Sequence, residues 1–154
     1  MSVVTFGVLL ALPSDVTGWS ARDRSWDGLR DEWRDFKRHV TSPPVWDGDS
    51  WFFNYVGHPY MGMHTYLLER NYGSSPVRSF LFSTGASVFF EYVIEAWAEP
   101  PSAQDLLITS PVGSVLGELN FRWTQRLRRE GLTFWEKVLV SAVNPLHVLQ
   151  HGYR

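Results

Sequence analysis

Apolar residues recur at three- and four-residue steps along much of the chain, which is the spacing of one face of an α-helix. Residues 20–40 show it most clearly, because Ser20 is a suitable N-cap and mixed charges occupy the other positions. This segment therefore predicts an amphipathic surface helix. Its apolar face consists of Trp26, Leu29, Trp33, Phe36 and Val40.

Proline and glycine set the limits of the other elements. Residues 41–50 predict a loop. A Ser-x-x-Asp sequence at 102–105 has the spacing of a capping box and opens a short turn. The Ser-Pro pair at 110–111 suits the start of a new helix, and the Asn-Pro pair at 144–145 ends the last one. We expect helices over residues 59–72, 79–99, 111–130 and 133–143.

A mostly α fold follows from these elements. A chain of 154 residues can bury a core and suits one domain. Residues 3–12 are apolar and β-branched at the start, so they fit a short strand as well as a helix. We predict a single domain over residues 1–154, a helical bundle of about four to five helices with an optional short N-terminal strand.

Composition and charge exclude several functions. The chain has no cysteine, so it has no disulfide, no thiolate nucleophile and no cysteine-bound metal. Its net charge of −2 argues against a nucleic-acid partner. Residues 40–121 hold two basic and eight acidic groups, whereas residues 122–154 hold six basic and two acidic groups. A solvated helix face, or contact with anionic lipid or a partner, would explain Arg122, Arg126, Arg128 and Arg129.

The sequence shows no evident signal peptide and no clear membrane span. Residues 1–12 are apolar but lack a basic start and a small-residue cleavage motif. No stretch of about eighteen consecutive residues is apolar throughout, as a clear solitary transmembrane helix requires.

A polar stripe runs along the otherwise apolar helix predicted at 79–99. Thr84, Ser87, Glu91 and Glu95 follow one another at three- and four-residue steps, with no lysine or arginine between them. A helix that is apolar nearly all round is usually buried, so we expect both its apolar residues and its stripe to be buried. Buried carboxylates must be paired, metal-bound or neutral.

Few residues can neutralise these glutamates. Arg70, Arg122 and His58 are the candidates, and Glu118 shares a helix face with Arg122. His58 precedes a helix on which Gly62, Tyr66 and Arg70 follow at four-residue steps. Gly62 and the Gly-x-x-x-Gly spacing of Gly113 and Gly117 would let helix backbones approach closely.

Three interpretations of this polar centre remain open. It could be a buried structural network of Glu, Arg, His and Tyr. It could be an acid/base pair of a hydrolase acting on lipid or glycan. It could also bind a metal through His58 and nearby carboxylates, although the Glu-x-x-His pair of di-iron bundles is missing. The sequence identifies no metal or cofactor and leaves open whether the protein is an enzyme. The candidate catalytic residues are His58, Glu91, Glu95 and Glu118.

Two runs, "PPVWDGDSWFFNYVGHPYMGMHTYLLERNYG" and "SVFFEYVIEAWAEPPSAQDLLITSPVGSVLGE", carry a family pattern. The pattern reads Asp-x-Asp-x-x-x-x-Asn-x-x-x-His-Pro, then an Arg, a Glu-x-x-x-Glu-x-x-x-Glu-x-Pro-Ser-x-x-Asp-Leu block, and Gly-Glu. Over residues 43–120 the chain resembles a bacterial domain-of-unknown-function family, number 3943. The resemblance and the expected pairing of arginines with glutamates together indicate a set of binding residues. These are Asp47, Asp49, Asn54, Arg70, Glu99, Ser102, Asp105 and Arg122.

The resemblance implies an envelope protein, periplasmic or membrane-associated, with no established activity. Further sequence often follows this region in the family, so we expect this chain to be a short or truncated form. Our first interpretation is an envelope-associated helical domain with a structural or binding role, whose partner is a membrane lipid or an envelope protein. The alternatives are the hydrolase and a membrane-embedded bundle, and a looser similarity to small envelope proteins with polar groups between short membrane helices supports the latter. The oligomeric state stays open.

Overall fold

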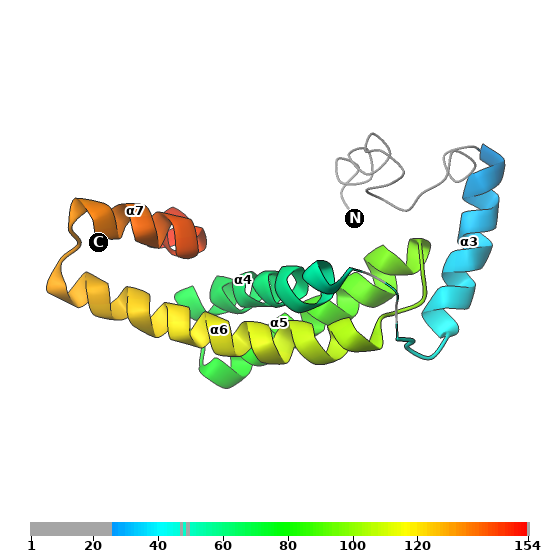
Figure 1. The fold of residues 1–154 in the computed structure, drawn as a ribbon, viewed down its shortest axis with the longest axis horizontal. Helices are drawn as coiled ribbons and strands as arrows, with labels where there is room; N and C mark the ends of the chain where they lie inside the picture. Colours follow the sequence, from blue (N-terminus) through cyan, green and yellow to red (C-terminus); the bar gives the residue numbers. More distant parts are fainter. Residues whose placement is uncertain (1–25, 47, 49, 154) are drawn as a thin grey trace. The chain divides into compact units, whose positions relative to one another are not determined.

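The computed structural model describes residues 26–46, 48 and 50–153. This part of the chain contains six α-helices and, beyond one isolated bridge between Val45 and Ser102, no strand (Figure 1). The predicted mostly α fold is therefore confirmed. The strand or helix expected at residues 3–12 lies outside the described residues.

The chain forms two compact units: Met1–Trp46 with Phe89–Ala103, and Asp47–Val88 with Gln104–Arg154. In the first unit, α3 (Trp26–Thr41) contacts the 3₁₀-helix η3 (Glu95–Trp97) and the π-helix η2 (Phe90–Ile94). The end of α3 agrees with the limit predicted for the first helix.

Aromatic side chains join the elements of the first unit. The rings of Phe36 and Trp97 stack with their centroids 4.5 Å apart, and Trp33 lies 5.8 Å from Trp97. Nδ1 of the buried His39 lies 3.0 Å from the carbonyl oxygen of Ala96. The predicted apolar face of α3 thus packs through its C-terminal half.

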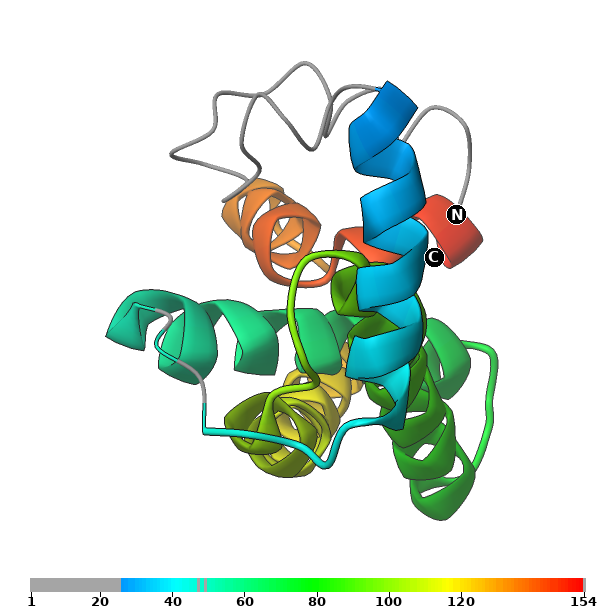
Figure 2. The same ribbon diagram turned by 90° about the vertical axis from the view of Figure 1, so that its right-hand side faces the viewer.

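The second unit is built on α4, α5 and α6. Thr65 Oγ1 lies 2.9 Å from Ser83 Oγ, and Arg78 pairs with Glu69 near the turn that joins the helices, so α4 and α5 are antiparallel. α4 and α6 run in the same general direction and meet at Gly62 and Gly113; Figure 2 shows α4 lying across α6, which is seen nearly end-on. The elements of this unit are η1 (Phe53–Gly57, a π-helix), α4 (His58–Asn71), α5 (Pro76–Phe89), α6 (Ala103–Glu130), α7 (Phe134–Val143) and α8 (Pro145–His151).

α7 and α8 show how far the predicted helix ends agree with the structure. The Thr133 side chain and Glu136 form a capping box, so the helix predicted at 133–143 is confirmed. The Asn-Pro pair at 144–145 does end α7, but it also begins α8, because the Asn144 side chain accepts a hydrogen bond from the backbone N–H of His147. The Asn-Pro pair therefore separates two helices, and the second of them, α8, was not predicted.

Two predicted limits are wrong. No new helix begins at Pro111, because α6 runs from Ala103 through it without a break. Pro111 removes one backbone donor and lies on the exposed side, where the helix tolerates it. The helix predicted at 79–99 begins earlier, at Pro76, and changes after Phe89 into η2 and η3.

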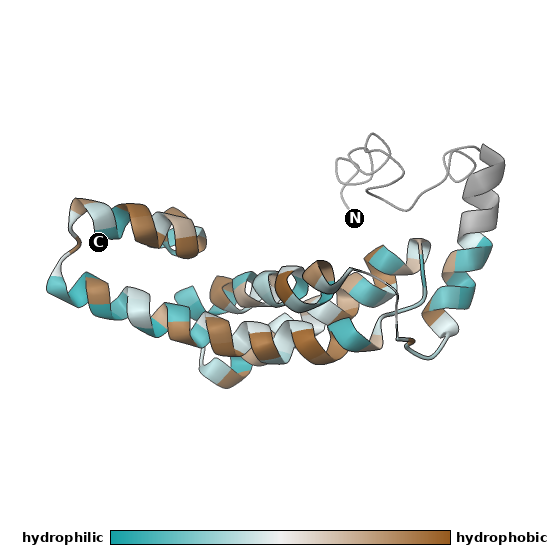
Figure 3. Ribbon diagram, in the orientation of Figure 1, coloured by the Kyte–Doolittle hydropathy of each residue, from teal (hydrophilic) through white to brown (hydrophobic). Residues whose placement is uncertain are grey.

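Polar and apolar side chains of the second unit are distributed in the reverse of the usual order. The polar stripe of α5 is buried as predicted at Ser87, but the apolar residues expected to be buried, such as Leu81 and Phe82, are exposed. α6 repeats the arrangement: Val115 and Leu119 are each 61% exposed. Figure 3 shows apolar positions recurring along these helices. Of the segments that the structure describes, none is both long and apolar enough to cross a membrane. The buried residues of α5 and α6 are Ser79, Ser83, Ser87, Gln104, Asp105, Thr109, Ser110, Gly113, Ser114, Gly117 and Thr124.

Candidate functional site

Glycines bring the backbones of α4 and α6 into direct contact. A Cβ atom on Gly62 would overlap the carbonyl group of Thr109, and one on Gly113 would lie 2.5 Å from the carbonyl carbon of Gly62. One turn further on, a Cβ on Gly117 would lie 2.6 Å from the Tyr66 ring. Real Cβ atoms do not approach other atoms so closely. The predicted close approach at the Gly-x-x-x-Gly pair is thus seen in the structure.

Small hydroxyl side chains continue this contact to α5. Ser83 Oγ donates to the carbonyl oxygen of Gly62 at 3.1 Å, and Thr65 Oγ1 lies within hydrogen-bond distance of the same hydroxyl. Ser83 is fully buried. We call the buried glycine and serine residues along α4, α5 and α6 the polar seam, since it holds the three helices together with small and polar groups.

Glu118 is the centre of a charged cluster at one end of the polar seam. Its Oε2 atom accepts hydrogen bonds from the Tyr66 hydroxyl at 2.6 Å and from Arg70 Nε at 2.9 Å. Its Oε1 atom accepts from Arg122 Nε at 2.7 Å. The Arg70 guanidinium also lies over the Phe121 ring, 3.9 Å from its centroid. We call these residues the Glu118 cluster.

The cluster changes the acidity of two of its members. Burial raises the pKa of Glu118, but the hydrogen bonds from Arg70, Tyr66 and Arg122 outweigh it and lower the pKa to about 2. Burial and the hydrogen bond to Glu118 raise the pKa of Tyr66 to about 12. Glu118 is therefore a carboxylate at neutral pH and is unsuited to act as a general acid there.

His58 lies near a buried carboxylate toward the other end of α4. Its Nδ1 atom is 3.5 Å from Asp105 Oδ1 and 3.3 Å from Thr109 Oγ1. The Asp105 side chain is almost fully buried, and that of His58 is mostly buried. A carboxylate beside a histidine orients the imidazole ring, which suits a structural contact and an acid/base role alike.

The profile of a family described as a domain of unknown function, DUF3943, matches residues 43–146. The chain belongs to this family. The match confirms the suspected family and extends beyond the predicted segment of 43–120 into α7 and α8. No curated protein and no solved structure matches the chain.

Two arginines of the DUF3943 domain have another partner than the one predicted for them. Arg70 and Arg122 were predicted to neutralise Glu91 and Glu95, but both bind Glu118 instead. In the first unit, Glu91 is buried and its Oε2 atom accepts a hydrogen bond from the backbone N–H of Ser102 at 2.8 Å.

The remaining predicted residues fall in different places. Glu95 and Glu99 are partly buried in the first unit, whereas His58, Asp105 and Glu118 belong to the second. A catalytic set of His58 with Glu91, Glu95 and Glu118 stays a prediction. So does a metal site of His58 with Glu91, Glu95, Asp105 or Glu118. Asn54 is buried in η1. The predicted binding residues Asp47 and Asp49 lie outside the described residues.

Sequence reasoning missed a group of buried amides that holds α8 against α4 and α6. Asn71 Nδ2 donates to Asn144 Oδ1 at 3.1 Å, and Asn144 Nδ2 donates to Thr124 Oγ1 at 3.4 Å. Only the position of Asn144 before a proline signalled a role, as a helix cap. Isolated asparagines elsewhere have no periodicity from which their contacts could be inferred.

His147 completes this group and is expected to make the domain sensitive to mild acid. His147 is 1% exposed, and burial, followed by the nearby Arg128 and His151, lowers its pKa to about 4. In the unfolded chain it takes up a proton near pH 6.5. Its contribution to the free energy of unfolding is therefore present above pH 6.5 and lost as the pH falls toward 4, by up to about 3 kcal/mol.

Urea unfolding at pH 7, 5.5 and 4 measures this effect. The variant His147→Phe should have a smaller loss of stability between pH 6.5 and 4 than the unmodified chain. Burial also lowers the pKa of His64, so a residual slope is expected in the variant. An unchanged slope would show that His147 is not the group responsible.

Proposed function

We propose that the DUF3943 domain is a lipid-facing structural and binding module of the bacterial cell envelope. The observation that carries the proposal is the reversed distribution of side chains in the second unit. Water-soluble domains bury their large apolar residues and expose polar ones. Here the buried positions along α5 and α6 are serine, threonine and glycine, apart from Gln104 and Asp105 at the start of α6, while phenylalanine, leucine and valine face outward.

A lipid environment explains both sides of this distribution. Hydrocarbon supplies no hydrophobic force that would drive helices together, so helices in lipid associate through small residues and hydrogen bonds. The contacts of Gly62 with Gly113 and of Ser83 with Gly62 are of this kind. In water, the same outer face would expose many large apolar side chains, and a contiguous apolar surface marks an interaction site.

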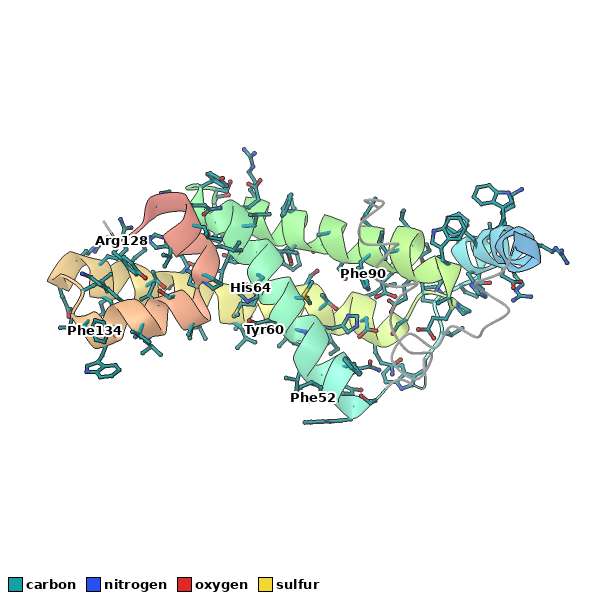
Figure 4. The ribbon with its side chains drawn as sticks, turned by 90° about the horizontal axis from the view of Figure 1, so that it is seen from above. Phe52, Tyr60, His64, Phe90, Arg128 and Phe134 are labelled. Atoms are coloured by element: carbon teal, nitrogen blue, oxygen red, sulfur yellow. The ribbon has the colours of Figure 1, made fainter. Side chains whose placement is uncertain are left out.

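Residues near the ends of α4 and α6 also favour a lipid membrane as the surroundings of this face. Exposed aromatic residues lie where the α4 segment begins, among them Phe52 and Tyr60 (Figure 4). Exposed arginines lie in the C-terminal half of α6, among them Arg122 and Arg126. Aromatic side chains are typical of membrane interfaces, and arginines attract anionic headgroups.

Flotation of the full chain with phosphatidylcholine vesicles, with and without an anionic lipid, tests the proposal. The chain should float with the vesicles, and Leu119→Glu should lower the bound fraction by at least about tenfold, because it places a charge on the lipid-facing side. The matched control Ser75→Glu adds the same charge in the exposed turn before α5 and should bind as the unmodified chain does.

The absence of cysteine allows a second readout at single positions. An environment-sensitive fluorophore attached to Val115→Cys should shift to the blue when vesicles are added, whereas one attached to Ser75→Cys should not. If the chain does not float but self-associates through the same face, the outer surface is covered by protein and the proposal is wrong.

A further inference from the structure

An open groove of about 740 Å³ lies between the C-terminal end of α4 and the C-terminal half of α6. Its volume lies within the range of small-molecule binding sites. The groove adjoins the Glu118 cluster and extends along α6 toward the segment that holds Arg128 in Figure 4. The residues that line it and carry the argument are Arg70, Asn71, Phe121, Arg122, Arg126 and Arg129.

Positive charge exceeds negative charge in this groove. Arg122, Arg126 and Arg129 follow one another at four- and three-residue steps, so they lie on one face of α6. Four arginines line the groove, and two carboxylates, Glu118 and Glu130, lie among them. Arg129 forms no ion pair or hydrogen bond with any residue that the structure describes. The groove therefore retains a capacity for an anion.

One arginine of the groove is held in place by its neighbours, and another is exposed and can change its conformation. Arg70 is held by Glu118 through Nε, by the carbonyl oxygen of Ser74 through Nη1, and by the face of Phe121. The N–H groups of its Nη2 atom remain available to donate to a ligand. Arg126 is 80% exposed, so it can move toward a ligand at little cost. Guanidinium groups bind the oxygens of phosphate in pairs, and this geometry makes arginine the preferred residue for phosphate recognition.

Asn71 lines the groove but does not offer its side-chain carbonyl oxygen to a ligand. Its Oδ1 atom is buried, has almost no accessible surface and accepts no hydrogen bond from the described residues. A phosphate in the groove is therefore bound through the arginines, whose paired N–H groups match its oxygens.

We propose that this arginine groove binds a phosphate monoester. The phosphate can belong to a soluble compound or to the headgroup of a lipid such as phosphatidic acid. The site goes beyond the lipid-facing surface, because a soluble phosphate binds it without any membrane.

Titration calorimetry of the full chain with inorganic phosphate and with glycerol 3-phosphate, at constant ionic strength, tests the soluble source. We expect saturable binding that Arg126→Gln/Arg129→Gln weakens by at least about tenfold. Both positions are exposed, so the variant should keep the circular dichroism spectrum of the unmodified chain. The matched control Arg78→Gln removes an arginine that is 74% exposed and lies outside the groove, and it should bind phosphate normally.

Vesicle flotation distinguishes the sources. Vesicles that contain phosphatidic acid are compared with vesicles that carry the same surface charge as oleate, which has a carboxylate and no phosphate ester. Stronger flotation with phosphatidic acid, reduced in Arg126→Gln/Arg129→Gln, supports a lipid headgroup, with or without soluble binding. Equal flotation with both vesicles and no soluble binding would overturn the phosphate site while leaving the lipid-facing surface intact. An equal loss of binding in Arg78→Gln would also overturn it, since the interaction would then be general attraction of charge.

Discussion

Gly113→Ala is expected to destabilise the DUF3943 domain by about 3 kcal/mol or to prevent its folding. Alanine favours a helix over glycine by roughly 1 kcal/mol, so propensity alone would stabilise the variant. The added Cβ, however, would lie 2.5 Å from the backbone of Gly62, and neither backbone can yield without separating α4 from α6. Chemical unfolding followed by circular dichroism measures the change in the free energy of unfolding.

Gly85→Ala is the matched control for this prediction. Gly85 lies within α5, and a Cβ atom there meets nothing within 4 Å. The substitution should therefore stabilise the protein by roughly 0.5–1 kcal/mol through helix propensity alone. If Gly113→Ala stabilised the protein to the same extent, the two helices would not meet at this point, and the polar seam would be rejected.

Glu118→Ala should cost about 3 kcal/mol at pH 7, the second large effect. The substitution leaves the largely buried Arg70 and the Tyr66 hydroxyl without their shared acceptor. Tyr66→Phe should cost about 1 kcal/mol, because it removes one hydrogen bond and leaves the ion pairs. Arg122→Gln should cost less than about 1 kcal/mol, since the arginine side chain is 73% exposed.

The same cluster should determine stability in strong acid. The pKa of Glu118 is about 2 in the folded protein, below the value near 4.5 of an ordinary glutamate. Its contribution is therefore fully present above pH 4.5 and is lost as the pH falls from 4.5 toward 2. Glu118→Gln should remove this loss and leave the loss between pH 6.5 and 4, which belongs to His147. Equal acid sensitivity of Glu118→Gln and the unmodified chain between pH 4.5 and 2 would contradict the assignment.

Local sequence signals predicted which segments are helical better than they predicted where each helix begins and ends. The helix predicted over 133–143 was found as α7, and the structure shows a capping box of Thr133 and Glu136 at its start, which depends on residues within one turn. Pro111 did not begin a helix as predicted, because α6 continues through it on its exposed side. Contacts between residues far apart in the sequence were harder to predict. Glu118 follows Tyr66 by 52 positions, and no local sequence signal links the two residues.

The sequence by itself determined that the chain is helical and that each central helix has a polar and an apolar side, since periodicity records both. It also placed the glycines at which two backbones could meet. Only the tertiary structure decided which side faces inward. A periodic pattern defines two faces of a helix but not the medium outside it, and the contact of Gly62 with Gly113 turns the polar side inward. The same contact brings Arg70 to Glu118, and so it also determined which carboxylate the arginines neutralise.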